Sequence, residues 1–116
     1  MKRKFRLTRS TDFKRVRRFG KSYAHPLIVL ISQPNELHTP RFGVAAGRSV
    51  GNAVRRNRAK RQIRETIRPL IPTIQSGWDI ILLARKPIAA ATYSEIEAAI
   101  YSLLRRASLL KDINVN

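Results

Sequence analysis

The chain has no cysteine, seven acidic residues and two histidines among its 116 residues. Without cysteine it can form neither a disulfide nor a thiolate metal site, which suits a cytosolic protein. No run of about 18 apolar residues is present, and no apolar segment follows the basic start at residues 1–5, so we expect neither a membrane span nor a signal peptide. The most basic stretches carry few large apolar residues, which argues against a lipid surface as partner.

The scarcity of acids and histidines also bears on catalysis. A protein nuclease would need clustered carboxylates to hold Mg²⁺ or a histidine pair for acid–base work. The acids are scattered, His25 and His38 fall in or beside expected loops, and only a chance of folding would bring Asp12, Glu65 and Asp79 together. No P-loop or nucleophile elbow is present. We therefore expect no catalytic residue and no metal site in the protein.

Positive charge is what the chain has in excess. Lys and Arg number 24 against seven acids, giving a net charge of +17 and a pI near 11.8, which predicts a strongly negative partner. Residues 1–21 carry ten Lys or Arg and residues 48–68 carry eight, whereas residues 22–47 carry only Arg41. This length forms one domain, so we expect a single domain over 1–116 in which a sheet separates two basic segments.

The second basic segment, residues 47–68, predicts a helix from about Asn52 to Arg68. Ser49 or Asn52 can cap it, and Pro69 ends it. At 100° per residue, the expected apolar side holds Ala59, Ile63, Thr66 and Ile67, and the opposite side holds Asn57, Arg58, Arg61, Arg64 and Arg68. Three residues depart from this division. Val54 lies among the arginines, whereas Asn52 and Arg56 project near the apolar side, and we expect Arg56 to point into a groove there.

A solvated face is the ordinary explanation for a basic helix. This helix, however, contains one acid, Glu65, so like charges repel without the oppositely charged neighbours that a solvated helix normally has. An anionic ligand relieves that repulsion. The residues themselves therefore predict an RNA- or DNA-binding module without an active site of its own.

The remaining segments predict an α+β protein. We expect residues 1–9 to form a basic arm with a mobile tip and residues 112–116 a frayed tail. A short helix starts at Ser10 or Thr11, has Phe13 and Val16 on its core side, and ends at Gly20. Strands are expected at 21–26 (an edge strand), 27–32, 41–46 and 78–84, and a last helix opens with the capping box Ser94-x-x-Glu97. We interpret this αβββαβα order as a two-layer sandwich of helices on an approximately four-stranded sheet, with the third and fourth strands parallel across the basic helix.

The segment Ser49-Val-Gly-Asn-Ala-Val-Arg-Arg-Asn-Arg-Ala-Lys-Arg-Gln-Ile-Arg-Glu65 closely resembles the signature of the bacterial ribonuclease P protein subunit. Phe-Lys-Arg-Val after Asp12, the Arg41-Phe-Gly-Val strand and Leu-Leu-Ala-Arg-Lys-Pro87 also look like elements of that family. The similarity thus extends over nearly the whole chain.

This resemblance implies a fold and a task. The fold would be an α+β sandwich whose strand–helix–strand crossover is left-handed, an exception to the usual rule. The protein would join a catalytic RNA in the cytoplasm, one protein per RNA, and help to remove the 5′ leader of precursor tRNA. Mg²⁺, bound mainly by the RNA, would serve the hydrolysis.

The resemblance also assigns residues to two sites. The catalytic RNA would contact Asn52, Arg55, Arg56, Asn57, Arg58, Lys60, Arg61 and Arg64. A cleft between the first helix and the sheet would hold the single-stranded leader, with walls drawn from Phe13, Arg17, Ile31, Phe42, Arg48, Ser49, Arg85 and Lys86.

Three cleft positions depart from the family pattern. Arg17 and Ile31 stand where relatives often have an aromatic residue, so guanidinium and aliphatic contacts would partly replace stacking on the leader. Arg48 stands where Lys is frequent, which keeps the charge but changes the donor geometry.

Composition alone is equally typical of a ribosomal or other structural RNA-binding protein, and a metal-dependent nuclease acting without RNA is a third possibility. The arginine-helix signature favours the ribonucleoprotein-enzyme subunit over the structural RNA-binding protein. Cleavage of precursor tRNA with and without the catalytic RNA would separate all three.

Overall fold

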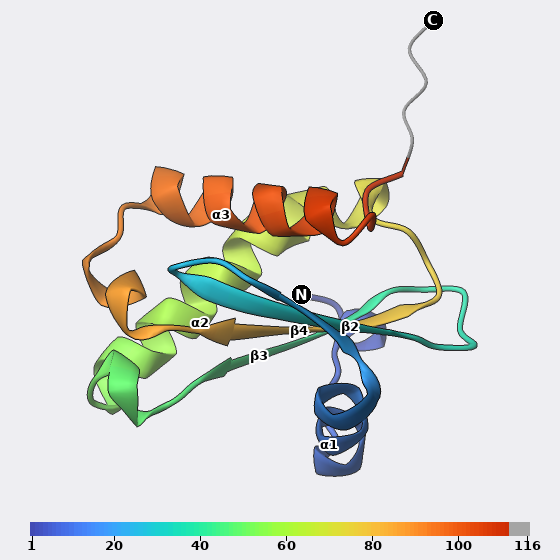
Figure 1. The fold of residues 1–116 in the computed structure, drawn as a ribbon, viewed down its shortest axis with the longest axis horizontal. Helices are drawn as coiled ribbons and strands as arrows, with labels where there is room; N and C mark the ends of the chain where they lie inside the picture. Colours follow the sequence, from blue (N-terminus) through green and yellow to red (C-terminus); the bar gives the residue numbers. More distant parts are fainter. Residues whose placement is uncertain (112–116) are drawn as a thin grey trace, which may run out of the picture.

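A computed structural model describes residues 1–111. A four-stranded sheet in the order β1-β2-β4-β3 has helices on both faces (Figure 1). The strands are β1 (Lys21–Ala24), β2 (Ile28–Pro34), β3 (Arg41–Ala46) and β4 (Trp78–Ala84), and the α-helices are α1 (Ser10–Phe19), α2 (Ala53–Ile67) and α3 (Tyr93–Arg106). Short 3-10 helices are η1 (Arg3–Phe5), η2 (Arg48–Val50), η3 (Arg68–Thr73) and η4 (Lys86–Ala90). The predicted α+β class and element order are confirmed; the predicted tail at 112–116 lies outside the described residues.

The sheet contains both parallel and antiparallel strand pairs. β4 lies in the middle, antiparallel to β2 and parallel to β3, as predicted for strands joined through the basic helix. β3 runs antiparallel to β2, but β4 separates the two. β1 is an edge strand, as predicted, and ends at Ala24 before Pro26. The left-handed sense of the β3–α2–β4 crossover stays a prediction of the family resemblance.

The main core lies between the sheet and the layer formed by α2 and α3. Alternate residues of β2 and β4, including Leu30, Ile80 and Leu82, are fully buried there, as expected for central strands covered on both faces. α2 contributes its predicted apolar side, Ala59, Ile63, Thr66 and Ile67, and α3 contributes its predicted stripe, Ile96, Ile100, Leu103 and Leu104. These two helices and the sheet form the predicted two-layer sandwich.

On the opposite face of the sheet lies α1, which covers only part of that face (Figure 1). A small apolar cluster joins Val16 of α1 to Ile31 and Ile81, with Leu7 of the arm beside them. Phe13 packs on this cluster, with its ring directly over Gly43, where an added Cβ would collide with it. Phe19, the last residue of α1, is 66% exposed.

α1 begins at Ser10, as predicted, with Arg9 at its N-cap and no side-chain cap. The arm fixes the position at which α1 begins. The Leu7 amide donates to the Phe42 carbonyl at 2.8 Å, which attaches this end of the arm to the edge of β3. The start of α3 differs from the prediction. The capping box of α3 is formed by Thr92 and Glu95 rather than by Ser94 and Glu97. Both pairs fit the capping pattern, and the earlier one leaves a full turn before buried Ile96.

Asp79, at the start of β4, is 0% exposed and anchors α1 to the sheet. Arg41 donates to both of its oxygens (2.9 and 2.8 Å), Asn35 donates to Oδ1 (2.8 Å), and Arg15 of α1 donates to Oδ2. Burial would raise the pKa of Asp79, but the hydrogen bonds from Arg41, Asn35 and Arg15 outweigh it, so the pKa lies below its ordinary value. The hydrogen bond to Asp79 correspondingly raises the pKa of Arg15 and of Arg41. Asp79 therefore stays ionised and joins three elements.

Replacing Asp79 tests this anchor. We expect Asp79→Asn to lower the free energy of unfolding by about 3–5 kcal/mol, because two guanidinium groups lose their buried counter-charge. Folding lowers the pKa of Asp79, so the ionised carboxylate stabilises the fold fully above the ordinary carboxyl pKa of about 4. This stabilisation is lost as the pH falls through the lower pKa of the folded state. Urea unfolding over a range of acidic pH should therefore show a shallower loss of stability in the variant. Glu36→Gln, which changes an exposed loop carboxylate, is the control. Equal acid dependence of wild type and Asp79→Asn would contradict the assignment.

Candidate nucleic-acid interface

The outward side of α2 is cationic along its whole length. The exposed side chains are Arg55, Asn57, Arg58, Arg61 and Arg64, while Arg56 and Lys60 are half-buried. Within residues 1–111, ion pairs join only Arg15 and Arg41 to Asp12 and Asp79, so no cation of α2 has an acidic partner there. Val54 lies among these residues and is 75% exposed. The structure thus places all the α2 residues predicted to bind RNA on the helix surface.

The start of α2 is held by its own loop. Asn52 is the N-cap, and its side chain accepts a hydrogen bond from the Arg55 amide at 2.9 Å, which decides between the two predicted caps. Gly51 has φ 138°, and an added Cβ would lie 2.7 Å from Cδ of Arg55. Arg56 donates to the Gly51 carbonyl at 3.4 Å instead of entering the core. Glycine at this position therefore lets the Arg55 side chain fold back over the loop.

Beyond α1, the sheet keeps an open stretch on the same face. Val29, Ala45 and Leu83 point to this face and are half-buried, because no helix covers them. Phe13 and Arg17, one helical turn apart on α1, stand on one side of the stretch. Arg48, Ser49, Arg85 and Lys86 are exposed and follow the carboxyl ends of the parallel strands β3 and β4, at its far end. Val29, Ala45 and Leu83 form the floor of this stretch and were not among the predicted site residues. The alternation of side chains along each strand would have placed them on this face.

Two predicted cleft residues lie elsewhere. Phe42 is 3% exposed and belongs to the core under α2, because it alternates with Gly43 on β3 and points away from α1. Ile31 points to the α1 face but is 7% exposed, because Val16 covers it. Neither side chain offers an open wall on that face, so both are corrected to core positions.

Phe42 also borders the edge of the sheet, where the two predicted sites approach each other. A hollow of about 240 Å³ at this edge is lined by Phe13 of α1, Phe42 and Val44 of β3, Arg64 of α2 and residues of the arm. The side of α2 that carries Arg64 and the helix that carries Phe13 are therefore neighbours across β3. The surface predicted for the catalytic RNA and the one predicted for the leader thus approach each other at the β3 edge of the sheet.

The acids considered for a metal site do not form one. Asp12 and Asp79 come together, but Arg15 and Arg41 lie between them, and Glu65 is exposed on α2. Among residues 1–111, no three His, Cys, Asp or Glu side chains gather where they could hold a metal ion. Over the same residues, no helix is long and apolar enough to span a membrane.

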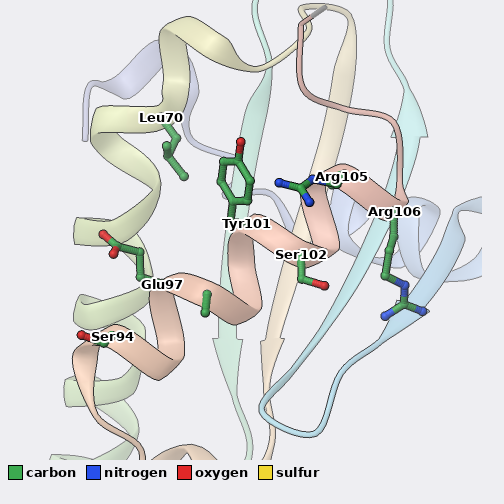
Figure 2. Close-up of a pocket in the computed structure, with 8 residues that line it drawn as sticks. Leu70, Ser94, Glu97, Tyr101, Ser102, Arg105 and Arg106 are labelled. Carbon is green, nitrogen blue, oxygen red and sulfur yellow. The ribbon is translucent and has the colours of Figure 1, made fainter.

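A groove on the outer side of α3 involves none of the predicted site residues. It has a volume of about 500 Å³ and runs past Glu97, Tyr101 and Arg105, with Leu70 across from them (Figure 2). The Arg105 guanidinium lies 4.8 Å from the centre of the Tyr101 ring, whereas Arg106 turns away and donates to the Ala24 carbonyl. Its mixed charge sets it apart from the cationic surfaces of α1 and α2.

Fold and surfaces together define a small α+β domain that presents unpaired cationic side chains on either side of one sheet. The family model for ribonuclease P matches residues 1–108. The chain is 40% identical over 112 residues to the ribonuclease P protein component of Herpetosiphon aurantiacus, covering 97% of this chain and 91% of that one. With the ribonuclease P protein component of Clostridium novyi it shares 39% identity over 94% of this chain and 98% of the relative.

Solved structures agree with these relatives. The RNase P protein of Staphylococcus aureus superposes with a TM-score of 0.85 at 31% identity, covering 92% of this chain and 98% of that one. The RNase P protein of Thermotoga maritima superposes with a TM-score of 0.80 at 30% identity, covering 87% and 96%. The chain belongs to the ribonuclease P protein component family, which supports a role as subunit of an endoribonuclease in tRNA processing.

Two glycine substitutions test how the loop positions α2. Gly51→Ala should lower the free energy of unfolding by about 1–3 kcal/mol, because an L-residue is strained at this φ and its Cβ would displace Arg55. Gly47→Ala is the matched control, since its Cβ would meet nothing within 4 Å. Thermal or urea unfolding of both variants measures the difference. Equal stability of the two variants would contradict the positioning role of Gly51.

Proposed function

We propose that the chain is the protein component of a ribonuclease P ribonucleoprotein, present at one copy per catalytic RNA. It binds that RNA through α2 and the 5′ leader of precursor tRNA through the open sheet face beside α1. In this way it assists Mg²⁺-dependent endonucleolytic removal of the leader, which gives mature tRNA 5′ ends. The observation that carries the proposal is the outward side of α2, whose cations have no acidic partner within the described residues.

Binding of the catalytic RNA follows from the electrostatics of α2. Arginine side chains without counter-charges replace condensed cations on the RNA, and the release of those cations drives association. If about seven phosphates are neutralised, the logarithm of the binding constant should fall with the logarithm of salt concentration with a slope of about −5. The rigid helix keeps these groups at fixed spacing, because its apolar side is held in the core by Ile63 and Ile67.

Binding of the leader follows from the open sheet face. Val29, Ala45 and Leu83 offer an aliphatic floor for unstacked bases, and Arg17, Arg48, Arg85 and Lys86 surround it with charges for phosphates. Phe13 supplies the aromatic ring on this side, while Phe42 and Ile31 support the face from within the core. Compared with a fully aromatic platform, this surface depends more on charge and aliphatic contact than on stacking.

The proposal places Mg²⁺ on the RNA, where it would activate the attacking water and stabilise the developing charge. The described part of the protein has no cluster of metal-ligating side chains, and its surfaces are cationic, so the protein is suited to phosphates rather than to Mg²⁺. Its contribution is electrostatic: positive charge between leader and catalytic RNA reduces their repulsion and extends the grip on substrate beyond the tRNA body.

Reconstitution tests the function and the role of α2 together. Adding the protein to the catalytic RNA should lower the Mg²⁺ concentration needed for 5′ cleavage of precursor tRNA. Arg58→Ala/Arg61→Ala should weaken association with the catalytic RNA by about 10- to 100-fold, with a slope less steep by about 1.5, because two phosphate contacts are lost. Binding titrations at several salt concentrations and cleavage assays measure both effects.

Arg105→Ala/Arg106→Ala is the matched control for these measurements, since it removes the same charge from α3. This control should keep its affinity within about threefold of wild type. The function would be rejected if the wild-type protein left the Mg²⁺ requirement unchanged, or if it cleaved precursor tRNA without the RNA. The placement on α2 would be rejected if both double variants lost affinity equally.

Arg17→Ala tests the leader surface without disturbing the core, because this side chain is exposed on α1. It should raise the KM for precursor tRNA with a leader of several nucleotides by about 3- to 10-fold, as one charge-assisted phosphate contact is lost. Affinity for leaderless tRNA should be unchanged. Arg18→Ala, one residue further along the helix, is the control. Equal losses for both substrates would place the role of Arg17 elsewhere.

A further inference from the structure

A hollow of about 370 Å³ lies between the first half of α2 and the segment of η4 that follows β4. It brings together two parts of the chain that are about thirty residues apart in sequence. Its lining consists of Arg55, Arg58, Ala59, Gln62, Ile88, Ala89, Ala90 and Ala91. The volume is within the usual range for small-ligand sites, about 300–1,000 Å³, and is ample for a single nucleobase.

The hollow has an apolar floor and a polar rim. Ala59 and Ile88 are 3% and 2% exposed and close the bottom. Arg55 and Arg58 stand one turn apart on the rim, and Gln62 follows one turn later. Over the described residues, none of these three side chains makes a hydrogen bond or ion pair. The rim therefore offers two free guanidinium groups and one free amide, facing the exposed side chains of Ala89 and Ala90 across the hollow.

The walls are fixed rather than adjustable. Ile88 is anchored in the core, its amide donates to the Arg85 carbonyl at 2.9 Å, and the Ala91 amide donates to the Ile88 carbonyl at 3.1 Å. The small alanine side chains of η4 leave the space open. On the opposite wall, Gly51 lets the stem of Arg55 fold back toward the loop. The hollow thus exists before any ligand arrives.

We propose that this hollow receives one unpaired nucleotide of the catalytic RNA, with its base packed against the alanine side chains of η4. The proposal rests on the proposed function, since it needs an RNA on α2. Unpaired nucleotides can turn their bases out of the stack and bind by their edges, which a duplex cannot do. Gln62 supplies a donor and an acceptor for the base edge, and Arg55 and Arg58 bind the flanking phosphates. A free phosphate ion would use the rim and leave the alanine side chains of η4 uncovered.

Filling the hollow separates base insertion from phosphate binding. Ala90→Leu should weaken association with the catalytic RNA by about tenfold without changing the slope of affinity against salt, because no phosphate contact is removed. Arg58→Ala should instead make the slope less steep by about one. The matched control is Ala98→Leu, the same substitution at an exposed alanine of α3 outside the hollow, which should bind as wild type does.

Chemical probing of the RNA 2′-hydroxyl groups gives the second measurement. Wild-type protein should change the reactivity of one unpaired nucleotide, and Ala90→Leu should abolish that change while other contacts persist. Gln62→Ala, which keeps the fold of the wall, should weaken the same change. The proposal would be overturned if Ala90→Leu bound with wild-type affinity and reactivity pattern, or if it lost affinity with an altered salt slope. Failure of the wild-type protein to bind the RNA at all would instead reject the proposed function.

Discussion

A buried carboxylate connects the two surfaces that we propose bind RNA. Asp79 lies at the start of β4 and accepts hydrogen bonds from Arg41 of β3 and Arg15 of α1. The Asn35 side chain donates a further hydrogen bond to it. Its position at the amino end of β4 keeps α1 over that half of the sheet and leaves the other half open. Besides this anchor, Val16 with its small apolar cluster and the Phe13 ring over Gly43 hold α1 in place.

The same anchor shapes the electrostatics of the molecule. The chain has seven acids for 24 basic residues, and Asp12 and Asp79 make the ion pairs of the described part with two arginines that neither surface uses for RNA. Within residues 1–111, the arginines of α2 and the cations around the open sheet face consequently have no acidic partner. An external polyanion is what neutralises them, and one sheet holds both surfaces at a fixed separation.

Sequence patterns were informative where one local rule decided the outcome. The 3.6-residue period of the basic helix identified its buried residues, because Ala59, Ile63 and Ile67 can only face the core. Patterns failed where two local solutions were equally good. Thr92 and Ser94 both fit a capping box. The family resemblance, not a pattern, assigned Phe42 to the leader surface, whereas its alternation with Gly43 on β3 turns it into the core.

By itself, the sequence determined the class of partner, the α+β order of elements and the amphipathic basic helix, because charge and hydrophobic period are properties of neighbouring residues. Tertiary structure alone decided that Asp79 would meet Arg15 and Arg41, that Ile31 would be covered, and that Arg55 and Arg58 would face Ile88 across a hollow. Those contacts join residues far apart in the chain. Their geometry depends on how strands pair and helices pack, which no local pattern records.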